Sequence, residues 1–77
     1  MKDSESFAAR FEDLLLRIAQ DGVCWRATVE EADDPSSALS DGTGYGTING
    51  AKQGAVSIAL ELFGTRVSPH RLEWRPE

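Results

Sequence analysis

Few side chains in this sequence could act in catalysis or bind a metal. The chain contains one histidine, His70, and one cysteine, Cys24, and no compact motif surrounds either of them. A metal site needs more ligands than these two residues supply, and no spacing brings carboxylates to them. A cysteine–histidine nucleophile pair needs both side chains on the same face of adjacent strands. Their register in the expected strands points them to opposite faces, so we predict a non-enzymatic protein that uses no cofactor.

A glycine-rich loop is the second candidate for chemistry. Glycines between positions 42 and 46 come immediately before an expected helix, and Lys52 lies one turn into that helix. Because backbone N–H groups at a helix N-terminus attract phosphate, Gly44, Gly46 and Lys52 form a hypothetical anion or nucleotide site. The Walker motif is absent, and the dinucleotide fingerprint fails because Gly50 stands one residue too far along. The simpler explanation is that these glycines turn the chain into the helix.

The acidic residues are concentrated in one segment, between positions 30 and 41, which holds no basic residue. The protein has a formal net charge of −5, whereas nucleic-acid binding requires lysines and arginines for phosphate contacts. Nucleic acid is therefore not the expected partner. Such a segment would attract a basic protein surface, and the alternative is a solvated loop that keeps the protein soluble. The predicted contact residues are Glu30, Glu31, Asp33, Asp34 and Asp41.

Length and composition predict a single α+β domain over residues 1–77. With 40% hydrophobic and 27% charged residues, the chain is typical of globular rather than disordered proteins. The single cysteine excludes an internal disulfide, which fits a reducing cytoplasm. No apolar run approaches the ~20 residues that span a bilayer, and no signal-peptide pattern is present. We therefore expect a cytoplasmic protein without a membrane partner.

Two elements are predicted before the acidic segment. Apolar residues at positions 7, 11, 14, 15 and 18 follow the spacing of one helix face, which predicts a helix over residues 4–21 that ends at Gly22. Residues 23–31 alternate between apolar and polar side chains, which predicts a half-buried strand. The residues expected on its apolar face are Val23, Trp25, Ala27 and Val29.

The second half of the chain predicts a loop, a helix and an edge strand. Because a loop over residues 32–46 would be unusually long, we expect a short strand within residues 38–45 that pairs with the first strand. A helix is predicted from residues 47–49 to Phe63, with Gly64 as its stop. A last strand over residues 66–75 is expected at a sheet edge, because Pro69 cannot donate to a neighbour. His70, Leu72 and Trp74 would share its apolar face.

The segment around the second helix resembles the second helix of double-stranded-RNA-binding domains. The matching residues are Gly44-Tyr45-Gly46, then Ala51-Lys52-Gln53-Gly54-Ala55-Val56 and Ala59-Leu60. The resemblance implies an α-β-β-β-α order, with glycines before the helix, an Ala-Lys step and small residues toward the sheet. Two departures separate the chain from that family. Ile48, Asn49 and Gly50 replace the paired lysines that hold RNA phosphates, and a strand is expected after the helix, so the resemblance does not carry RNA binding with it.

Together these patterns predict a two-layer α+β sandwich in the order α-β-(β)-α-β, with two helices on one face of a small antiparallel sheet. The predicted function is a stoichiometric inhibitor or adaptor that contacts a basic protein surface. In size and charge the chain is similar to phage-encoded inhibitors of host defence, including anti-CRISPR proteins. The alternative is a dsRBD-like or nucleotide-binding module that uses the glycine loop. If the last strand paired with a second copy of itself, Arg71 would lie opposite Arg75 and Glu73 opposite Glu73. Because like charges directly opposite destabilise a strand pair, a monomer is expected rather than a dimer.

Overall fold

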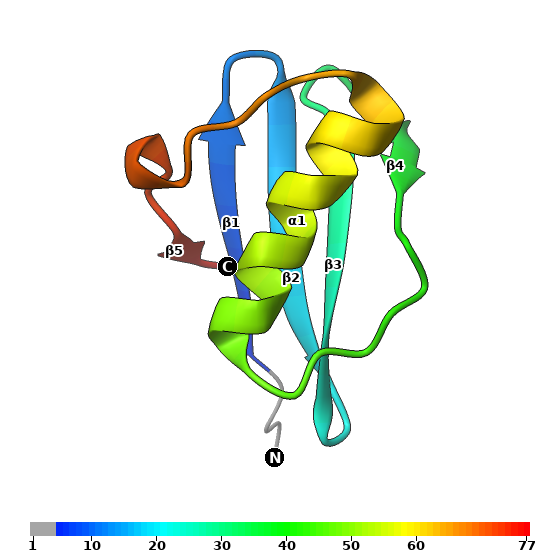
Figure 1. The fold of residues 1–77 in the computed structure, drawn as a ribbon, viewed down its shortest axis with the longest axis vertical. Coiled ribbons are helices and arrows are strands. Elements are labelled where there is room, and N and C mark those ends of the chain that lie inside the picture. The colour runs from blue at the N-terminus through cyan, green and yellow to red at the C-terminus, as the bar shows by residue number, and fades with distance from the viewer. Residues whose placement is uncertain (1–4) are drawn as a thin grey trace.

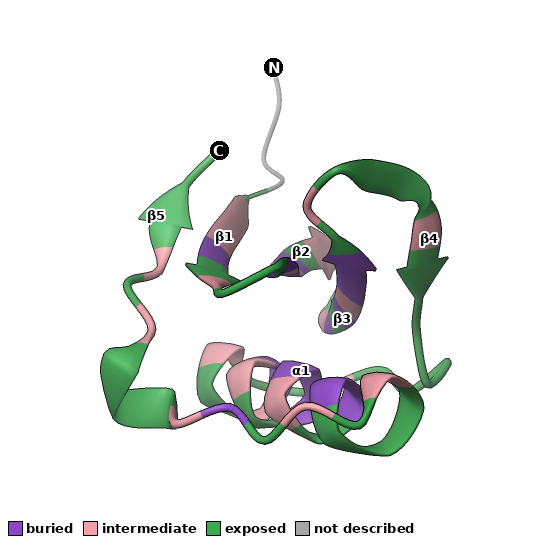
Figure 2. Cartoon of the chain, turned by 90° about the horizontal axis from the view of Figure 1, so that it is seen from above, coloured by how far each residue is buried: buried purple, intermediate pink, exposed green. Residues whose placement is uncertain are grey.

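The computed structural model describes residues 5–77, which form one sheet and one α-helix packed on it (Figure 1). The five strands are antiparallel and lie in the order β4-β3-β2-β1-β5. The helix crosses one face of this sheet, and the core lies between the two layers (Figure 2). In chain order the elements are β1 (Ser6–Phe11), β2 (Leu14–Asp21), β3 (Cys24–Glu31), β4 (Asp34–Leu39), α1 (Ile48–Phe63), the 3-10 helix η1 (Pro69–Arg71) and β5 (Arg75–Pro76).

The helix predicted over residues 4–21 is wrong. From Ser6 onward this stretch forms the β1–β2 hairpin, while residue 4 lies outside the described residues. Leu14, Leu16 and Ile18 alternate along β2 and are buried at 0–5% exposure, because that face of the strand lies against the helix layer. As the central strand, β2 also pairs its backbone with β1 on one side and β3 on the other. The predicted pair of helices on one face is therefore replaced, within residues 5–77, by a sheet-dominated fold with one α-helix.

The strand predicted over residues 23–31 is confirmed as β3. Trp25, Ala27 and Val29 are buried in the core as expected. Val23 is 93% exposed, so its expected place on the apolar face is wrong, because it belongs to the turn before the strand. The short strand expected within residues 38–45 is misplaced, because β4 spans Asp34–Leu39 and pairs with β3 through an irregular register. Tyr45 adds one further bridge to Trp25.

The second predicted helix is confirmed as α1. The hydroxyl of Thr47 accepts a hydrogen bond from the Gly50 N–H at 3.0 Å, and Gly64, with a φ of 68°, ends the helix in the left-handed conformation. Three alanines that recur at every fourth residue of α1 are fully buried in the interface with β2 and β3. Their small side chains let the helix approach the sheet closely. These residues are Ala51, Ala55 and Ala59.

The two glycines inside α1 form a seat for the Tyr45 ring. A methyl group added at Gly54 would collide with that ring, and one at Gly50 would stand 3.5 Å from it. The Tyr45 backbone exchanges hydrogen bonds with Trp25 at 2.7 and 2.8 Å. The loop before the helix is therefore held between β3 and α1. This contact explains why glycine stands at two positions inside α1, although glycine weakens an isolated helix.

The strand predicted over residues 66–75 is mostly absent. Pro69 begins η1 instead, since its fixed φ suits a turn and it lacks an N–H for a ladder. Only β5 remains, at the predicted sheet edge, paired with β1. His70 is exposed in η1, so its expected place on an apolar strand face is wrong, whereas Leu72 and Trp74 are half-buried against the core.

The seat for Tyr45 can be tested by a double-mutant cycle. Gly54→Ala is expected to destabilise the protein by about 1 kcal/mol, because overpacking costs roughly 1–3 kcal/mol and exceeds the helix-propensity gain of about 1 kcal/mol. In a Tyr45→Ala background the same change is expected to stabilise by about 1 kcal/mol, since the obstacle is gone. Urea unfolding of the four proteins measures the coupling, with Gly50→Ala as a control of smaller effect. Independent effects at the two positions would contradict the close contact.

Candidate functional site

Among the described residues, the two turns at one end of the molecule carry five exposed carboxylates. The β1–β2 and β3–β4 turns lie side by side there, because the Ala32 N–H donates to the Asp13 carbonyl at 2.8 Å. Both turns lie at the end of the sheet where α1 also ends (Figure 1). A shallow hollow of about 170 Å³ between the turns and the helix end is lined by Glu12, Asp13 and Glu31. We call this surface the acidic end, and its residues are Glu12, Asp13, Glu31, Asp33 and Asp34.

Within residues 5–77 no carboxylate of the acidic end forms an ion pair, although the Arg10 guanidinium lies at the β1–β2 turn and donates to the backbone carbonyl of Glu12 at 3.0 Å. The four ion pairs in this part of the chain all use other carboxylates. The last turn of α1 carries no basic residue and holds Glu61, so the negative pole of the helix adds to the carboxylates. Arg66 lies two residues beyond Gly64 and forms no ion pair there. The result is a concentrated negative potential at one end of the sheet.

Backbone geometry singles out Glu12. Its φ is 53°, and it is the one non-glycine residue with a positive φ among the described residues. The β2–β3 turn uses Gly22 for such a conformation, at a φ of 67°. A non-glycine residue held there costs about 1–3 kcal/mol, and such residues cluster at functional sites. A charged side chain at a position that favours glycine points to a role at the surface rather than in the turn.

The structure divides the sequence-predicted contact residues into two groups. Glu31, Asp33 and Asp34 are exposed at the acidic end. Glu30 points to the face of the sheet away from α1 and is only 6% exposed. Its Oε1 forms an ion pair with Nη1 of Arg17 at 2.7 Å. Arg17 also binds Glu77 at 3.1 Å, so this network links β3, β2 and the C-terminal residue. Glu30 therefore serves the fold, because a buried carboxylate needs a charged partner.

Asp41 is engaged within its own loop. It accepts hydrogen bonds from the Tyr45 hydroxyl at 2.6 Å and from the Thr43 N–H at 2.9 Å. These bonds lower the pKa of Asp41 from its usual value, and the hydrogen bond to Asp41 raises the pKa of Tyr45. Since Tyr45 pairs with Trp25 near the β2–β3 turn, Asp41 is tied to the opposite end of the sheet from the acidic end.

The residues of the hypothetical anion site do not converge. Gly44 packs on Cys24, at 3.3 Å from where its Cβ would stand, and nothing lies within 4 Å of the equivalent point at Gly46. Lys52 extends along the other flank of α1, where its Nζ lies 5.8 Å from the centroid of the Trp74 ring. The glycines and the lysine are therefore on different sides of the helix.

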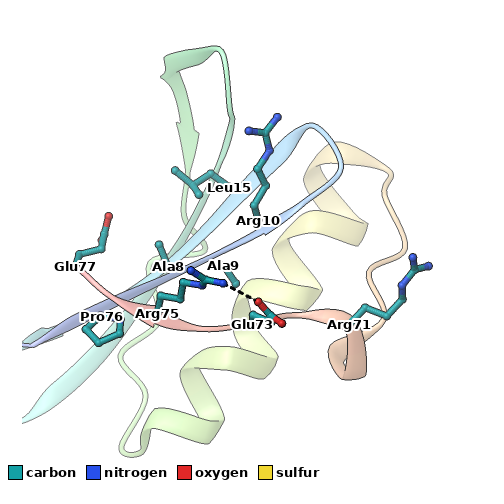
Figure 3. Close-up of a pocket in the computed structure, with 9 residues that line it drawn as sticks. All are labelled: Ala8, Ala9, Arg10, Leu15, Arg71, Glu73, Arg75, Pro76 and Glu77. Carbon is teal, nitrogen blue, oxygen red and sulfur yellow. Dashed lines mark hydrogen bonds and ion pairs between the residues drawn. The ribbon is translucent and has the colours of Figure 1, made fainter.

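A hollow of about 450 Å³ lies between β1 and the C-terminal segment (Figure 3). Arg10, Arg71 and Arg75 line it, but their side chains do not converge on one point in Figure 3. Arg75 already binds Glu73 at 3.0 Å. The three arginines therefore do not form a site for a single anion.

The cysteine and the histidine considered as a nucleophile–base pair lie on different elements. Cys24 is on β3 and His70 is in η1 beyond the far edge of the sheet, with β2 and β1 between them. Residues 5–77 contain no group of three or more histidine, cysteine or acidic side chains that could hold a metal ion. Nor does any helix in this stretch have the length and apolar character needed to cross a bilayer.

Sequence reasoning missed Glu12 and Asp13. Their signal is a pair of polar residues between two runs that alternate in polarity, which is typical of a tight hairpin. The helical spacing of the same region hid that signal. Comparisons supply no independent assignment: no family model matches the sequence, and neither curated proteins nor solved structures give a significant match.

The buried network can be tested by removing one partner. Arg17→Met is expected to destabilise the protein by about 1–3 kcal/mol, less than a fully buried pair because the Arg17 side chain is 39% exposed. Adding Glu30→Gln should recover part of the loss, since the unpaired buried charge is then absent. Urea unfolding at neutral pH measures both. An unchanged midpoint for Arg17→Met would show that the network contributes nothing.

Replacement of Glu12 by glycine tests the strained turn. Glu12→Gly is expected to raise the free energy of unfolding by about 0.5–1 kcal/mol, because relief of the positive φ exceeds the entropy that glycine adds to the unfolded chain. Thermal unfolding should show a midpoint several degrees higher. Asp13→Gly is the matched control and should destabilise, since Asp13 has no positive φ. Equal shifts for the two variants would rule out strain at Glu12.

Proposed function

We propose that this protein is a non-enzymatic binding protein, a stoichiometric inhibitor or adaptor, whose acidic end contacts a basic surface of a partner protein. The observation that carries the proposal is the convergence of five exposed carboxylates from two turns on one end of the sheet. None of them is used in an ion pair within residues 5–77. Like charges held together oppose folding, so their grouping favours a role in recognition.

Three further features support this proposal. Glu12 occupies a strained position, where a charged residue costs stability that glycine would not. Cys24 and His70 are separated by two strands, which leaves no nucleophile–base pair between them. The partner would be met in the cytoplasm, and we propose that the protein acts there as a monomer. Pro35 in β4 and the two-residue length of β5 limit pairing at both sheet edges.

The alternative is a dsRBD-like or anion-binding module built on Gly44, Gly46 and Lys52. The observed order does not follow the α-β-β-β-α order implied by that resemblance, because β1 and β2 stand where its first helix would be. Lys52 also points away from the glycine loop. These observations favour protein binding over nucleic-acid binding, and the two are separable in one experiment.

The experiment compares three baits in a lysate of the organism that encodes the protein. They are the unaltered chain, an acidic-end variant (E12Q/E31Q/D33N) and a control with the same change in charge (E5Q/D21N/E73Q). The first and the control are expected to retain the same basic protein. The acidic-end variant should bind it about tenfold more weakly, because exposed charge pairs contribute roughly 0.2–1 kcal/mol each. Affinity for the purified partner, by titration at two salt concentrations, gives the magnitude and its screening.

The outcomes distinguish the hypotheses. Equal affinity of the two variants would show that the acidic end is a solubilising surface only. Recovery of RNA or DNA, lost after nuclease treatment and after Lys52→Gln, would favour the alternative module. A gel shift of the unaltered chain with duplex RNA checks that result directly.

A further inference from the structure

A groove separates α1 from the C-terminal segment on the flank of the helix that faces away from β4. Its volume is about 510 Å³, which is within the range typical of small-molecule sites. The helix forms one wall, and the chain between η1 and β5 forms the other. The lining residues are Asn49, Lys52, Gln53, Val56 and Ser57 from the helix side, and Pro69, Leu72 and Trp74 opposite.

The floor of this groove is apolar and only partly covered. Val56, Leu72 and Trp74 pack against the core with one side and keep intermediate exposure on the other. Polar side chains of the helix border the floor along one side. Apolar surface of this kind, with a few polar groups beside it, is typical of ligand sites.

The charge of the groove is opposite to that of the protein. Among the described residues, Lys52 is the one charged side chain in its lining and no carboxylate lines it, although the chain carries a net charge of −5. The Lys52 ammonium lies over the Trp74 ring, 5.8 Å from its centroid. It forms no ion pair among the described residues.

From this complementarity we propose that the groove binds a small amphipathic anion, a flat aromatic ring system that carries one carboxylate or sulfonate group. The anionic group pairs with Lys52, and the ring system stacks on Trp74 and covers Val56. Asn49, Gln53 and Ser57 offer hydrogen bonds at the polar side of the groove. This site is separate from the acidic end, and the inference does not depend on the proposed function.

The probe is 8-anilinonaphthalene-1-sulfonate, an aromatic anion with a planar naphthalene ring whose fluorescence rises in apolar surroundings. One site per chain is expected, on protein that retains cooperative unfolding. The Trp74 indole N–H resonance should shift, whereas that of Trp25, which is buried in the core, should not. The neutral analogue N-phenyl-1-naphthylamine should bind about three- to tenfold more weakly, because it cannot pair with Lys52.

Matched variants at one position isolate the charge. Val56→Asp and Val56→Lys remove the same apolar contact and introduce opposite charges. The first is expected to weaken binding of the probe at least tenfold, and the second to bind it several-fold more tightly than the first. Lys52→Met should reduce affinity about three- to tenfold, while the acidic-end variant E12Q/E31Q/D33N should leave it unchanged.

Three results would overturn the proposal. One is the absence of saturable binding to the folded chain. Another is equal affinity for Val56→Asp and Val56→Lys, which would show that charge has no part in recognition. The last is a resonance shift confined to residues outside the groove. If a variant fails to unfold cooperatively, the comparison of the charged and neutral probes on the unaltered chain still decides the question.

Discussion

The close approach of α1 to the sheet is the constraint on which the rest of the structure depends. Ala51, Ala55 and Ala59 are fully buried against β2 and β3, and larger residues would push the helix away. A domain of 77 residues has a thin core. It therefore depends on dense packing of a few large side chains, of which Leu16, Ile18 and Val29 are the largest that are fully buried. The bulk of this core comes from the strands, and the helix contributes a small-residue surface.

Because α1 lies so close to the sheet, the Tyr45 ring packs beside the interface formed by the three alanines and not within it. Its ring covers Gly50 and Gly54 on one flank of the helix, while Lys52 and Val56 face the opposite flank beside Trp74. One aromatic residue from a connecting segment thus lies against each flank. The Tyr45 side is held by backbone bonds to β3 and by Asp41. The Trp74 side is held by η1, the short β5 and the ion pair between Arg17 and Glu77, and there the groove stays open.

Charge is distributed unevenly over the fold. On the sheet face away from α1, opposite charges pair, as in Arg17 with Glu30 and Glu77 and in Arg26 with Asp21. The acidic end has no such partners among the described residues, and the C-terminus of α1 adds to its potential. One part of the surface therefore satisfies its charges internally, and the other leaves them available. That difference, rather than the total of −5, is what supports the proposed binding role.

Local patterns in the sequence were sufficient for the elements whose signals have one interpretation. The cap at Thr47, the stop at Gly64 and the alanine spacing determined α1, and the alternation through Trp25, Ala27 and Val29 determined β3. Helix geometry also places Lys52 away from Gly50 and Gly54, since a step of two residues reaches the opposite flank. This much follows from bonds between near neighbours and from residue spacing.

Only the tertiary structure decided the rest. The spacing of the apolar residues between positions 7 and 18 is compatible with both a helix and a hairpin. The hairpin forms because β3 supplies backbone and side-chain partners along the whole of β2. Two adjacent carboxylates likewise have different roles. Glu30 is buried and forms an ion pair with Arg17, while Glu31 lies exposed beside Glu12 and Asp13 of the β1–β2 turn. Periodicity and composition describe single segments. Pairing between segments depends on which partners the folded chain brings within hydrogen-bond distance, and that information is not local.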